Sequence, residues 1–270
     1  MSGSVTFGKR LSKWRRKRGL SQLELALAAA CSQRHVSFLE LDRTQPSRDM
    51  VLRLSDALDL PLRQSNALLL AAGFAPIWAE SDLSAEALAP IRQALNFMLM
   101  QQEPFPAVVV DRRWNLLQAN TAATKLVTFL TGPIATGTPI NLADATVAPD
   151  ILRPYLVNWP DVVAYFIRTV EADENADGSH QTAELLARLK TYPDVSTIRD
   201  DQTMSLPEGP VLPMHFEKNG THLRLFTTLA TLGTPQDITL QELRIECFFP
   251  MDDATADVFR AWAAERGTEV

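Results

Sequence analysis

Apolar residues recur at helical spacing through the first quarter of the chain, and short polar, glycine or proline breaks interrupt them. Gly19 and Gly73 stand where a left-handed residue commonly ends a helix. Ser21 and Glu24 have the spacing of a capping box, and Ser32 has the position of another N-cap. The pattern therefore predicts five short helices, which cover residues 7–17, 21–29, 32–40, 50–58 and 61–72.

Beyond residue 105 the apolar pattern changes from helical to alternating spacing. The β-rich runs 107–110 and 114–119 flank a polar turn, and Asn120 is placed to cap the helix that follows. Asn219-Gly220 is a favoured pair for a tight turn between two strands. Further strands are predicted over 211–217, 222–232 and 243–249, and helices over 88–100, 121–129, 149–156, 160–172, 182–191 and 253–265, with 173–179 as an acidic loop.

These elements predict two domains. Residues 1–75 are expected to form an all-α domain of five helices that contains a helix-turn-helix. Residues 76–104 are expected to connect it to an α+β domain over 105–270, in which one antiparallel sheet is flanked by helices. A length of 270 residues suits two domains of ordinary size.

Charge divides the chain in the same way. Residues 1–75 carry 12 Lys and Arg against 6 Asp and Glu, whereas residues 76–270 carry 14 against 26. A basic head on an acidic body favours nucleic-acid binding through the head alone. No signal peptide and no apolar run of bilayer length is visible, so a cytoplasmic protein without a membrane partner is expected.

The sequence contains little that indicates catalysis or metal binding. Cys31 and Cys247 lie far apart without CxxC spacing, so both are expected to be reduced core residues. The four histidines lack the spacing of a zinc site. Motifs such as GxSxG, the P-loop and GxGxxG are missing, so neither an enzyme nor a cofactor is expected.

Two of the predicted helices, 21–29 and 32–40, are separated by a tight turn. This is the layout of a helix-turn-helix, in which the second helix enters the major groove of DNA. The polar face of that second helix carries Gln33, Arg34 and Ser37. Glutamine can pair bidentately with adenine and arginine with guanine, so double-stranded DNA is the expected partner.

The head carries a set of short runs in a fixed order: Gly19-Leu20-Ser21-Gln22, Leu25-Ala26, Val36, Leu39-Glu40 and Pro46-Ser47. Through them, residues 7–73 resemble the XRE-type helix-turn-helix of phage repressors. The resemblance implies backbone contact by Gln22 and base contacts from the start of the second helix. The expected DNA-binding residues are Arg15, Gln22, Ser32, Gln33, Arg34, Ser37, Arg43 and Thr44, with Arg15, Arg43 and Thr44 on phosphates.

Ala30 departs from the family pattern, and two of the polar side chains have a second possible role. The family often has a glycine near Ala30, and a non-glycine residue with positive φ is strained there. For single residues, a structural role is an open alternative, with Ser32 acting only as an N-cap and Arg34 only as a solvated charge.

The body carries a second ordered set: residues 106–115, Ala119-Asn120, Asn141-Leu142, Asn158-Trp159, 212–214, 233–237 and 242–246. Through it, residues 105–253 resemble the MmyB-like ligand-binding domain of bacterial transcription regulators. The resemblance implies a PAS-like sheet with helices on one face. It also implies a buried cavity for a small apolar ligand, such as a fatty acid.

Such a cavity needs apolar walls and a few polar groups that orient the ligand. A carboxylate head would need Arg or His at the mouth, and His215, His222 and Arg224 are candidates. The alternative is that the wall candidates are simply core residues. These candidates are Trp114, Leu117, Phe166, Leu185, Leu189, Met214, Phe216, Leu223, Leu225, Ile245 and Cys247.

The sequence therefore predicts a transcription regulator that binds specific DNA, acts as a homodimer and senses a small apolar ligand. A dimer is expected because one recognition helix reads only a few base pairs. Two alternatives stay open. The body could serve only for dimerisation of a constitutive DNA-binding protein, or the head could be the DNA tether of an enzyme.

Overall fold

A computed structural model describes residues 5–133, 137, 139–200 and 211–265. The chain divides into two compact units, each of which is described by itself. The N-terminal unit comprises Met1–Ser81 together with Thr234–Gln241, and the C-terminal unit comprises Asp82–Gly233 together with Glu242–Val270. A short stretch from the last third of the chain is thus part of the N-terminal unit.

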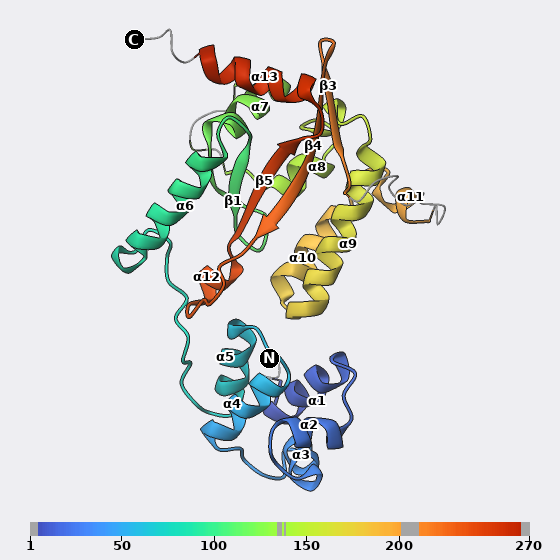
Figure 1. Cartoon of the computed structure of the whole chain (residues 1–270). Helices are drawn as coiled ribbons and strands as arrows, with labels where there is room; N and C mark the ends of the chain where they lie inside the picture. The colour runs from blue at the N-terminus through green and yellow to red at the C-terminus, as the bar shows by residue number, and fades with distance from the viewer. Residues whose placement is uncertain (1–4, 134–136, 138, 201–210, 266–270) are drawn as a thin grey trace. The chain divides into compact units, whose positions relative to one another are not determined.

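The N-terminal unit contains the five predicted helices around one apolar core (Figure 1). Leu11, Leu25, Val36, Leu39 and Leu54 are fully buried at its centre. Gly19 and Gly73 adopt the expected left-handed conformation, with φ of 69° and 85°. The helices are α1 (Phe7–Lys17), α2 (Gln22–Ala28), α3 (Gln33–Glu40), α4 (Arg48–Ala57) and α5 (Leu62–Ala71).

Local capping explains where α2 and α3 begin. The Ser21 hydroxyl accepts a hydrogen bond from Glu24 N while the Glu24 carboxylate accepts one from Ser21 N, which completes the predicted capping box. Ser32 caps α3 by accepting from His35 N at 3.1 Å. Gly8 lets α1 approach the end of α3, since a Cβ there would lie 2.5 Å from the carbonyl oxygen of Glu40.

Residues 234–241 bind to the N-terminal unit through backbone and side-chain hydrogen bonds. Ile238 N donates to the Ala79 carbonyl at 2.8 Å, and the Thr239 hydroxyl donates to the Ser81 carbonyl at 2.7 Å. The Gln241 side chain accepts from Leu62 N at 2.8 Å, at the first residue of α5. Because Pro61 offers no side-chain cap, Gln241 supplies the missing N-cap acceptor from a distant part of the sequence.

The C-terminal unit is built on a five-stranded sheet in the order β2-β1-β5-β4-β3, in which all neighbours are antiparallel. This confirms the expected α+β fold with an antiparallel sheet flanked by helices. The tight turn at Asn219-Gly220 joins β3 to β4 as predicted. The strands are β1 (Ala107–Val110), β2 (Leu116–Ala119), β3 (Met214–Lys218), β4 (Thr221–Ala230) and β5 (Arg244–Pro250).

Helices cover one face of this sheet and enclose the main core (Figure 1). Fully buried Leu130, Val163, Leu189 and Leu223 show how α7, α9, α10 and β4 share that core. The α-helices of this unit are α6 (Ala89–Gln102), α7 (Thr121–Thr131), α8 (Leu142–Val147), α9 (Trp159–Asp177), α10 (His180–Leu189), α11 (Val195–Asp200) and α13 (Asp253–Ala264), with 3₁₀ turns at Glu86–Leu88 and Arg153–Tyr155. Helix α12 (Ile238–Glu242) belongs to the N-terminal unit except for its last residue.

The structure corrects three local predictions. Residues 173–177 continue α9 instead of forming an acidic loop, because Asp173 and Asp177 are paired with arginines. Helix α8, which Asn141 caps, was not predicted, whereas 149–156 contains only turns and one 3₁₀ turn. Trp114 lies in the turn before β2 with φ of 64°, so the strand begins at Leu116.

Candidate functional site

The N-terminal end of α3 presents the polar face expected of a recognition helix. Ser32, Gln33 and Arg34 are all exposed. The Arg34 guanidinium lies 5.1 Å from the centre of the Phe38 ring, so Phe38 holds its stem against the helix. Exposed hydrogen-bond donors at the start of a helix can reach base edges in the major groove, and the stacking on Phe38 orients the guanidinium of Arg34 for such a contact.

The other residues predicted to bind DNA surround this face in different environments. Arg43 is exposed, and Thr44 and Ser37 are half-buried. Arg43 also closes the end of α3, since its N–H donates to the Phe38 carbonyl at 2.8 Å. Basic and hydroxyl side chains that flank a recognition helix suit contacts with phosphates.

Arg15 and Gln22 are instead engaged inside the unit. The Arg15 guanidinium donates from Nε and Nη2 to the two carboxylate oxygens of Glu40, at 2.6 and 2.9 Å, and from Nη1 to the Leu20 carbonyl. The Gln22 amide donates to Glu40 at 2.8 Å. Burial raises the pKa of Glu40, but the hydrogen bonds from Arg15 and Gln22 outweigh it and hold that pKa below its usual range. This cluster joins α1, α2 and α3.

The turn between α2 and α3 keeps a left-handed residue without glycine. Ala30 has φ of 50°. Its N–H donates to the Leu27 carbonyl at 3.2 Å, and Cys31 N donates to the Ala26 carbonyl at 2.8 Å, so the turn closes normally. Ala30 therefore carries backbone strain that a glycine would not.

A cavity of about 380 Å³ lies in the C-terminal unit between the sheet and helices α7, α8 and α9. Its volume falls within the range of small-molecule sites, roughly 300–1,000 Å³. Its walls are mostly aliphatic and aromatic. The lining residues are Pro106, Val108, Trp114, Ala123, Leu126, Val127, Leu130, Leu142, Thr146, Leu152, Val162, Tyr165, Phe166, Thr169, Val211, Leu212, Met214, Phe216, Thr227, Leu229, Glu246 and Phe248.

Four of the predicted wall residues line this cavity: Trp114, Phe166, Met214 and Phe216. Trp114 and Phe166 pack edge to face with their ring centres 4.6 Å apart, which rigidifies one wall. Both side chains come from segments that are far apart in the sequence. The structure thus gathers them at one site.

The other seven predicted wall residues do not line the cavity. Leu185, Leu189, Leu223 and Leu225 belong to the buried core, as the core interpretation held. Within the last strand, Glu246 and Phe248 face the cavity, so the alternating Ile245 and Cys247 lie on the opposite face. Leu117 is 40% exposed.

The expected carboxylate-binding groups are also on the other side of the sheet. Arg224 lies between the buried Leu223 and Leu225 in β4 and is exposed. Its Nε donates to His215 Nε2 at 3.2 Å, and burial with the nearby Arg224 charge lowers the pKa of His215. Neither residue, nor the exposed His222, is among the residues that line the cavity.

Glu246 is the site residue that sequence reasoning missed. It is 9% exposed and lies in the central strand of the sheet, with its side chain in the cavity wall. Burial raises its pKa to about 7, against the opposing effects of a hydrogen bond from Thr227 and the charge of Arg244. The available signal was its place in the sequence, a lone acidic residue between Ile245 and Cys247, with only apolar residues from there to Pro250.

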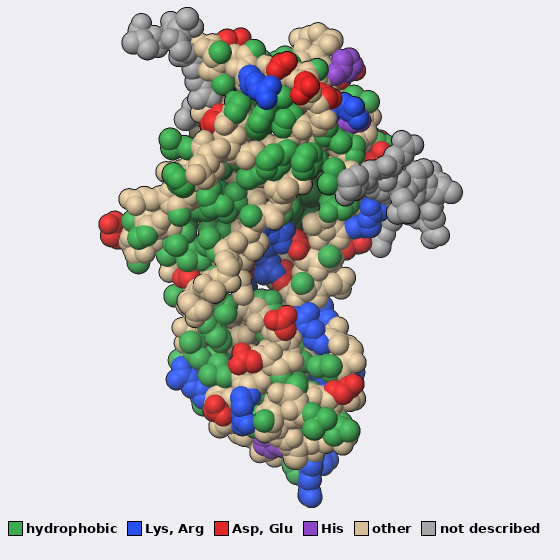
Figure 2. Space-filling model, in the orientation of Figure 1, with side chains coloured by type: hydrophobic (Ala, Val, Ile, Leu, Met, Phe, Trp, Pro, Cys, Tyr) green, Lys and Arg blue, Asp and Glu red, His purple; other side chains and the backbone are tan. Residues whose placement is uncertain are grey.

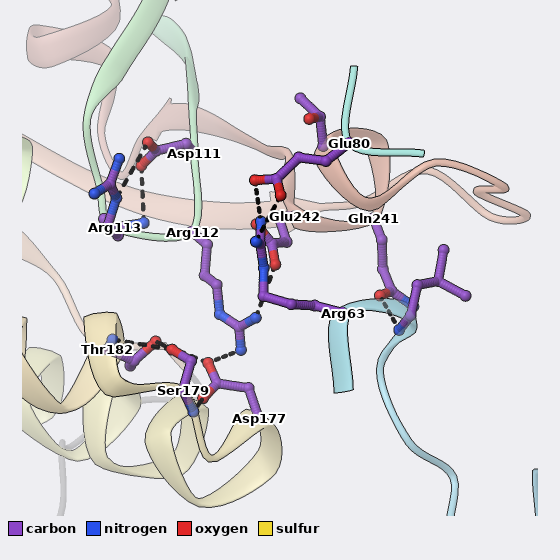
Figure 3. Close-up of polar contacts among 12 residues, drawn as sticks. Arg63, Glu80, Asp111, Arg112, Arg113, Asp177, Ser179, Thr182, Gln241 and Glu242 are labelled. Atoms are coloured by element: carbon purple, nitrogen blue, oxygen red, sulfur yellow. Dashed lines mark hydrogen bonds and ion pairs between the residues drawn. The ribbon is translucent and has the colours of Figure 1, made fainter. Parts of the chain in front are cut away.

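A buried cluster of ion pairs holds the start of β5 in place. The Arg112 guanidinium, from the turn after β1, points toward the carboxylates of Asp177 and Glu242 (Figure 3). Asp177 is 1% exposed and also accepts from the Thr182 hydroxyl at 2.8 Å. Arg244 pairs with Asp173 at 2.7 Å. The cluster ties the β1–β2 turn and the end of α9 to the start of β5, two residues before Glu246.

Other site types find no support in the part of the chain that the structure describes. Cys31 and Cys247 are free and half-buried, and burial raises the pKa of both thiols. Among the described residues, no group of three or more His, Cys, Asp and Glu is arranged to hold a metal ion. No described helix combines the length and apolar character required to cross a membrane.

Comparison with known proteins identifies both units. Residues 11–64 match the helix-turn-helix family, and residues 91–261 match the MmyB-like transcription regulator ligand binding domain. Comparison with curated proteins gives no match. Both matched families are families of transcription regulators and not of enzymes.

Among solved structures, one titled "Structure of an RNA-binding Light-Oxygen-Voltage Receptor" aligns with 98% of this chain at 11% identity and a TM-score of 0.30. The chain spans 63% of the length of that structure. The family match covers more than half of the chain. The chain therefore belongs to the MmyB-like transcription regulators, with an XRE-type helix-turn-helix that binds DNA in front of a ligand-binding domain.

Proposed function

We propose that this regulator binds a specific operator sequence through the start of α3, and that a small apolar ligand in the cavity controls this binding. The observation that carries the proposal is the cavity itself, about 380 Å³ of mostly apolar space within the ligand-binding domain. A fatty acid is the ligand class that the family resemblance implies. The apolar walls support the hydrocarbon part of such a molecule.

On the DNA side, we assign base contacts to Gln33 and Arg34, which are exposed at the start of α3, with Ser32 and Ser37 beside them. Arg43 and Thr44 are the proposed phosphate contacts. The Arg15–Glu40 cluster is assigned a structural role, because its donors are used within the unit. Gln22 orients α2 against α3 through the same carboxylate.

Gel-shift titrations with genomic fragments test the DNA-binding part. Removing a base contact in Gln33→Ala or Arg34→Ala is expected to weaken operator binding about tenfold or more and to relax the sequence preference. Lys13→Ala, which removes one exposed charge from α1, is the matched control and should weaken binding equally for all sequences. Equal behaviour of the three variants would contradict the assignment.

Native mass spectrometry of the purified chain, before and after extraction with organic solvent, tests the ligand. A co-purified apolar molecule, with a shift in operator affinity after its removal, is the expected result. A clean protein whose operator affinity does not respond to any added amphiphile would favour the alternative function, in which this domain serves only dimerisation.

We also propose that the regulator acts as a homodimer in the cytoplasm, where its operators lie. The face of the sheet opposite the cavity supports a dimer. On it, the rings of Phe226 and Phe249 stack with their centres 5.4 Å apart, and both side chains remain half-buried. Figure 2 shows hydrophobic side chains gathered over β4 and β5 on this face. Sedimentation of the full chain over a dilution series should show a reversible dimer, and a monomer at every concentration would contradict it.

A further inference from the structure

Glu246 occupies a position that an apolar cavity does not by itself explain. It lies on β5, the central strand, with Val108 of β1 and Leu229 of β4 as its cross-strand neighbours. Both neighbours line the cavity with it. A carboxyl group at the middle of an apolar wall costs stability, so its presence there calls for a partner.

The protein itself satisfies only part of the hydrogen-bonding capacity of the Glu246 carboxylate. The Thr227 hydroxyl donates one hydrogen bond to the carboxylate, whereas an ionised carboxylate has roughly four acceptor positions. Arg244 is the positive charge that acts on it from the same strand, and that guanidinium is already paired with Asp173 of α9. Among the described residues that line the cavity there is no Lys, Arg or His.

Trp114, which also lines the cavity, carries a buried donor without a partner. Trp114 is 3% exposed, and within the described part of the chain its indole Nε1 has no hydrogen-bond acceptor. Arg244 lies over this ring at 5.6 Å from its centre, which holds the indole in place. This N–H is itself buried and closed to a ligand, so the Glu246 carboxyl group is the charged acceptor that the cavity wall offers.

A hydroxyl group is the simplest group that satisfies this acceptor, because it donates a hydrogen bond without bringing a second charge into the apolar cavity. An ammonium group would form a buried ion pair with Glu246, and the cost of removing both charges from water offsets much of the attraction between them. An ionised carboxylate would meet the Glu246 carboxylate without a cation between them, and could enter only with a proton shared between the two.

We propose that Glu246 recognises the polar end of the ligand and that the ligand is an apolar molecule carrying a hydroxyl group. This inference rests on the proposed ligand-binding function and specifies the chemistry of that site. A fatty acid would then bind only in protonated form or to protonated Glu246. Its binding would strengthen as the pH falls toward and below neutrality, since the pKa of Glu246 is raised to about 7.

The test compares decan-1-ol, decylamine and decanoate, which share one hydrocarbon length. Each displaces the neutral fluorophore N-phenyl-1-naphthylamine from the full chain at pH 6 and pH 8. The variants are Glu246→Gln and the control Glu217→Gln, which changes an exposed glutamate of β3. Circular dichroism checks that each variant is folded.

At pH 8 the wild-type chain should bind decan-1-ol about tenfold more tightly than decanoate. Glu246→Gln should weaken decan-1-ol binding roughly fivefold and strengthen decanoate binding by a similar factor, because the repelling charge is gone. Decanoate should bind the wild-type chain more tightly at pH 6 than at pH 8, and Glu246→Gln should reduce that difference. Glu217→Gln should behave as the wild type.

Two results would overturn the proposal in different ways. If decanoate or decylamine binds the wild-type chain most tightly at pH 8 and Glu246→Gln leaves the order unchanged, the assignment of Glu246 is wrong while the ligand-binding function stands. If the fluorophore and all three compounds fail to bind, the function on which the assignment rests is wrong as well.

Discussion

Replacing Glu40 with alanine is expected to lower the free energy of unfolding of the N-terminal unit by about 3–5 kcal/mol. The Glu40 carboxylate accepts hydrogen bonds from Arg15 at 2.6 and 2.9 Å and from Gln22 at 2.8 Å. Its side chain is 6% exposed and that of Arg15 is 11% exposed. The substitution therefore leaves a buried guanidinium without its counter-charge, which costs more than the pair itself contributes.

This cost is large relative to the stability of the unit. At about 0.05–0.15 kcal/mol per residue, a unit of this length has roughly 4–13 kcal/mol of stability. Replacing both partners, as in Arg15→Met with Glu40→Leu, removes the buried charges together and should restore most of the loss. The comparison separates the cost of an unpaired charge from the contribution of the pair.

The same carboxylate predicts a pH dependence. The pKa of Glu40 is lower in the folded unit than its usual value of 4.5, so the unfolded chain takes up its proton first as the pH falls. The stabilisation from Glu40 is fully present above 4.5 and is lost as the pH falls through the folded pKa. The double variant should lack this component of acid unfolding.

Hydrogen–deuterium exchange of the full chain, read by mass spectrometry on peptides from α1 and α3, measures the effect within this unit. Asp56→Ala, which removes an exposed acidic side chain of α4, is the control. It should change the free energy of unfolding derived from exchange by less than about 0.5 kcal/mol. A loss below about 1 kcal/mol in Glu40→Ala, or a double variant less stable than the single one, would refute the reasoning.

Three further predictions concern single residues. Ala30→Gly should stabilise the N-terminal unit by about 0.5–1 kcal/mol in the same exchange assay, because it relieves a φ of 50° at some cost in chain entropy; a destabilisation would contradict the strain. Gln241→Ala should destabilise α5 by about 1 kcal/mol, seen as faster exchange at Leu62 and its neighbours, and unchanged exchange would remove its role as a cap. Because the pKa of Glu246 is raised from 4.5 to about 7 in the folded unit, ionising this carboxyl group opposes folding. The C-terminal unit should therefore lose on the order of 3 kcal/mol of stability as the pH rises from 4.5 through about 7. Urea-dependent proteolysis should show this loss in the wild type and not in Glu246→Gln.

The DNA-binding unit could be predicted closely because its signals are local. Caps at Ser21 and Ser32 and the left-handed Gly19 act within a few residues, and each is found as expected. Arg15 shows the limit of such reasoning. A basic residue on α1 suggests a phosphate contact, but its burial depends on Glu40, which lies 25 residues further along the chain.

The ligand site was harder to predict because the sheet decides which residues face the cavity. The alternation in the last strand identified two faces, and the apolar Ile245 and Cys247 were assigned to the wall. In the structure the wall takes the other face, with Glu246 and Phe248. Similarly, the acidic run at 173–177 reads as a solvated loop until Arg112 and Arg244, both distant in sequence, neutralise it.

The placement of residues 234–241 in the N-terminal unit has a consequence for how the protein is made. The hydrogen bonds from this segment to Leu62, Ala79 and Ser81 can form only after residue 241 has left the ribosome. At about 5–20 residues per second, the 160 residues after Ser81 take roughly 8–32 s to synthesise. A chain that stops before residue 241 therefore carries a helix-turn-helix unit with α5 uncapped, so this unit becomes fully stable only after most residues of the ligand-binding domain have been synthesised.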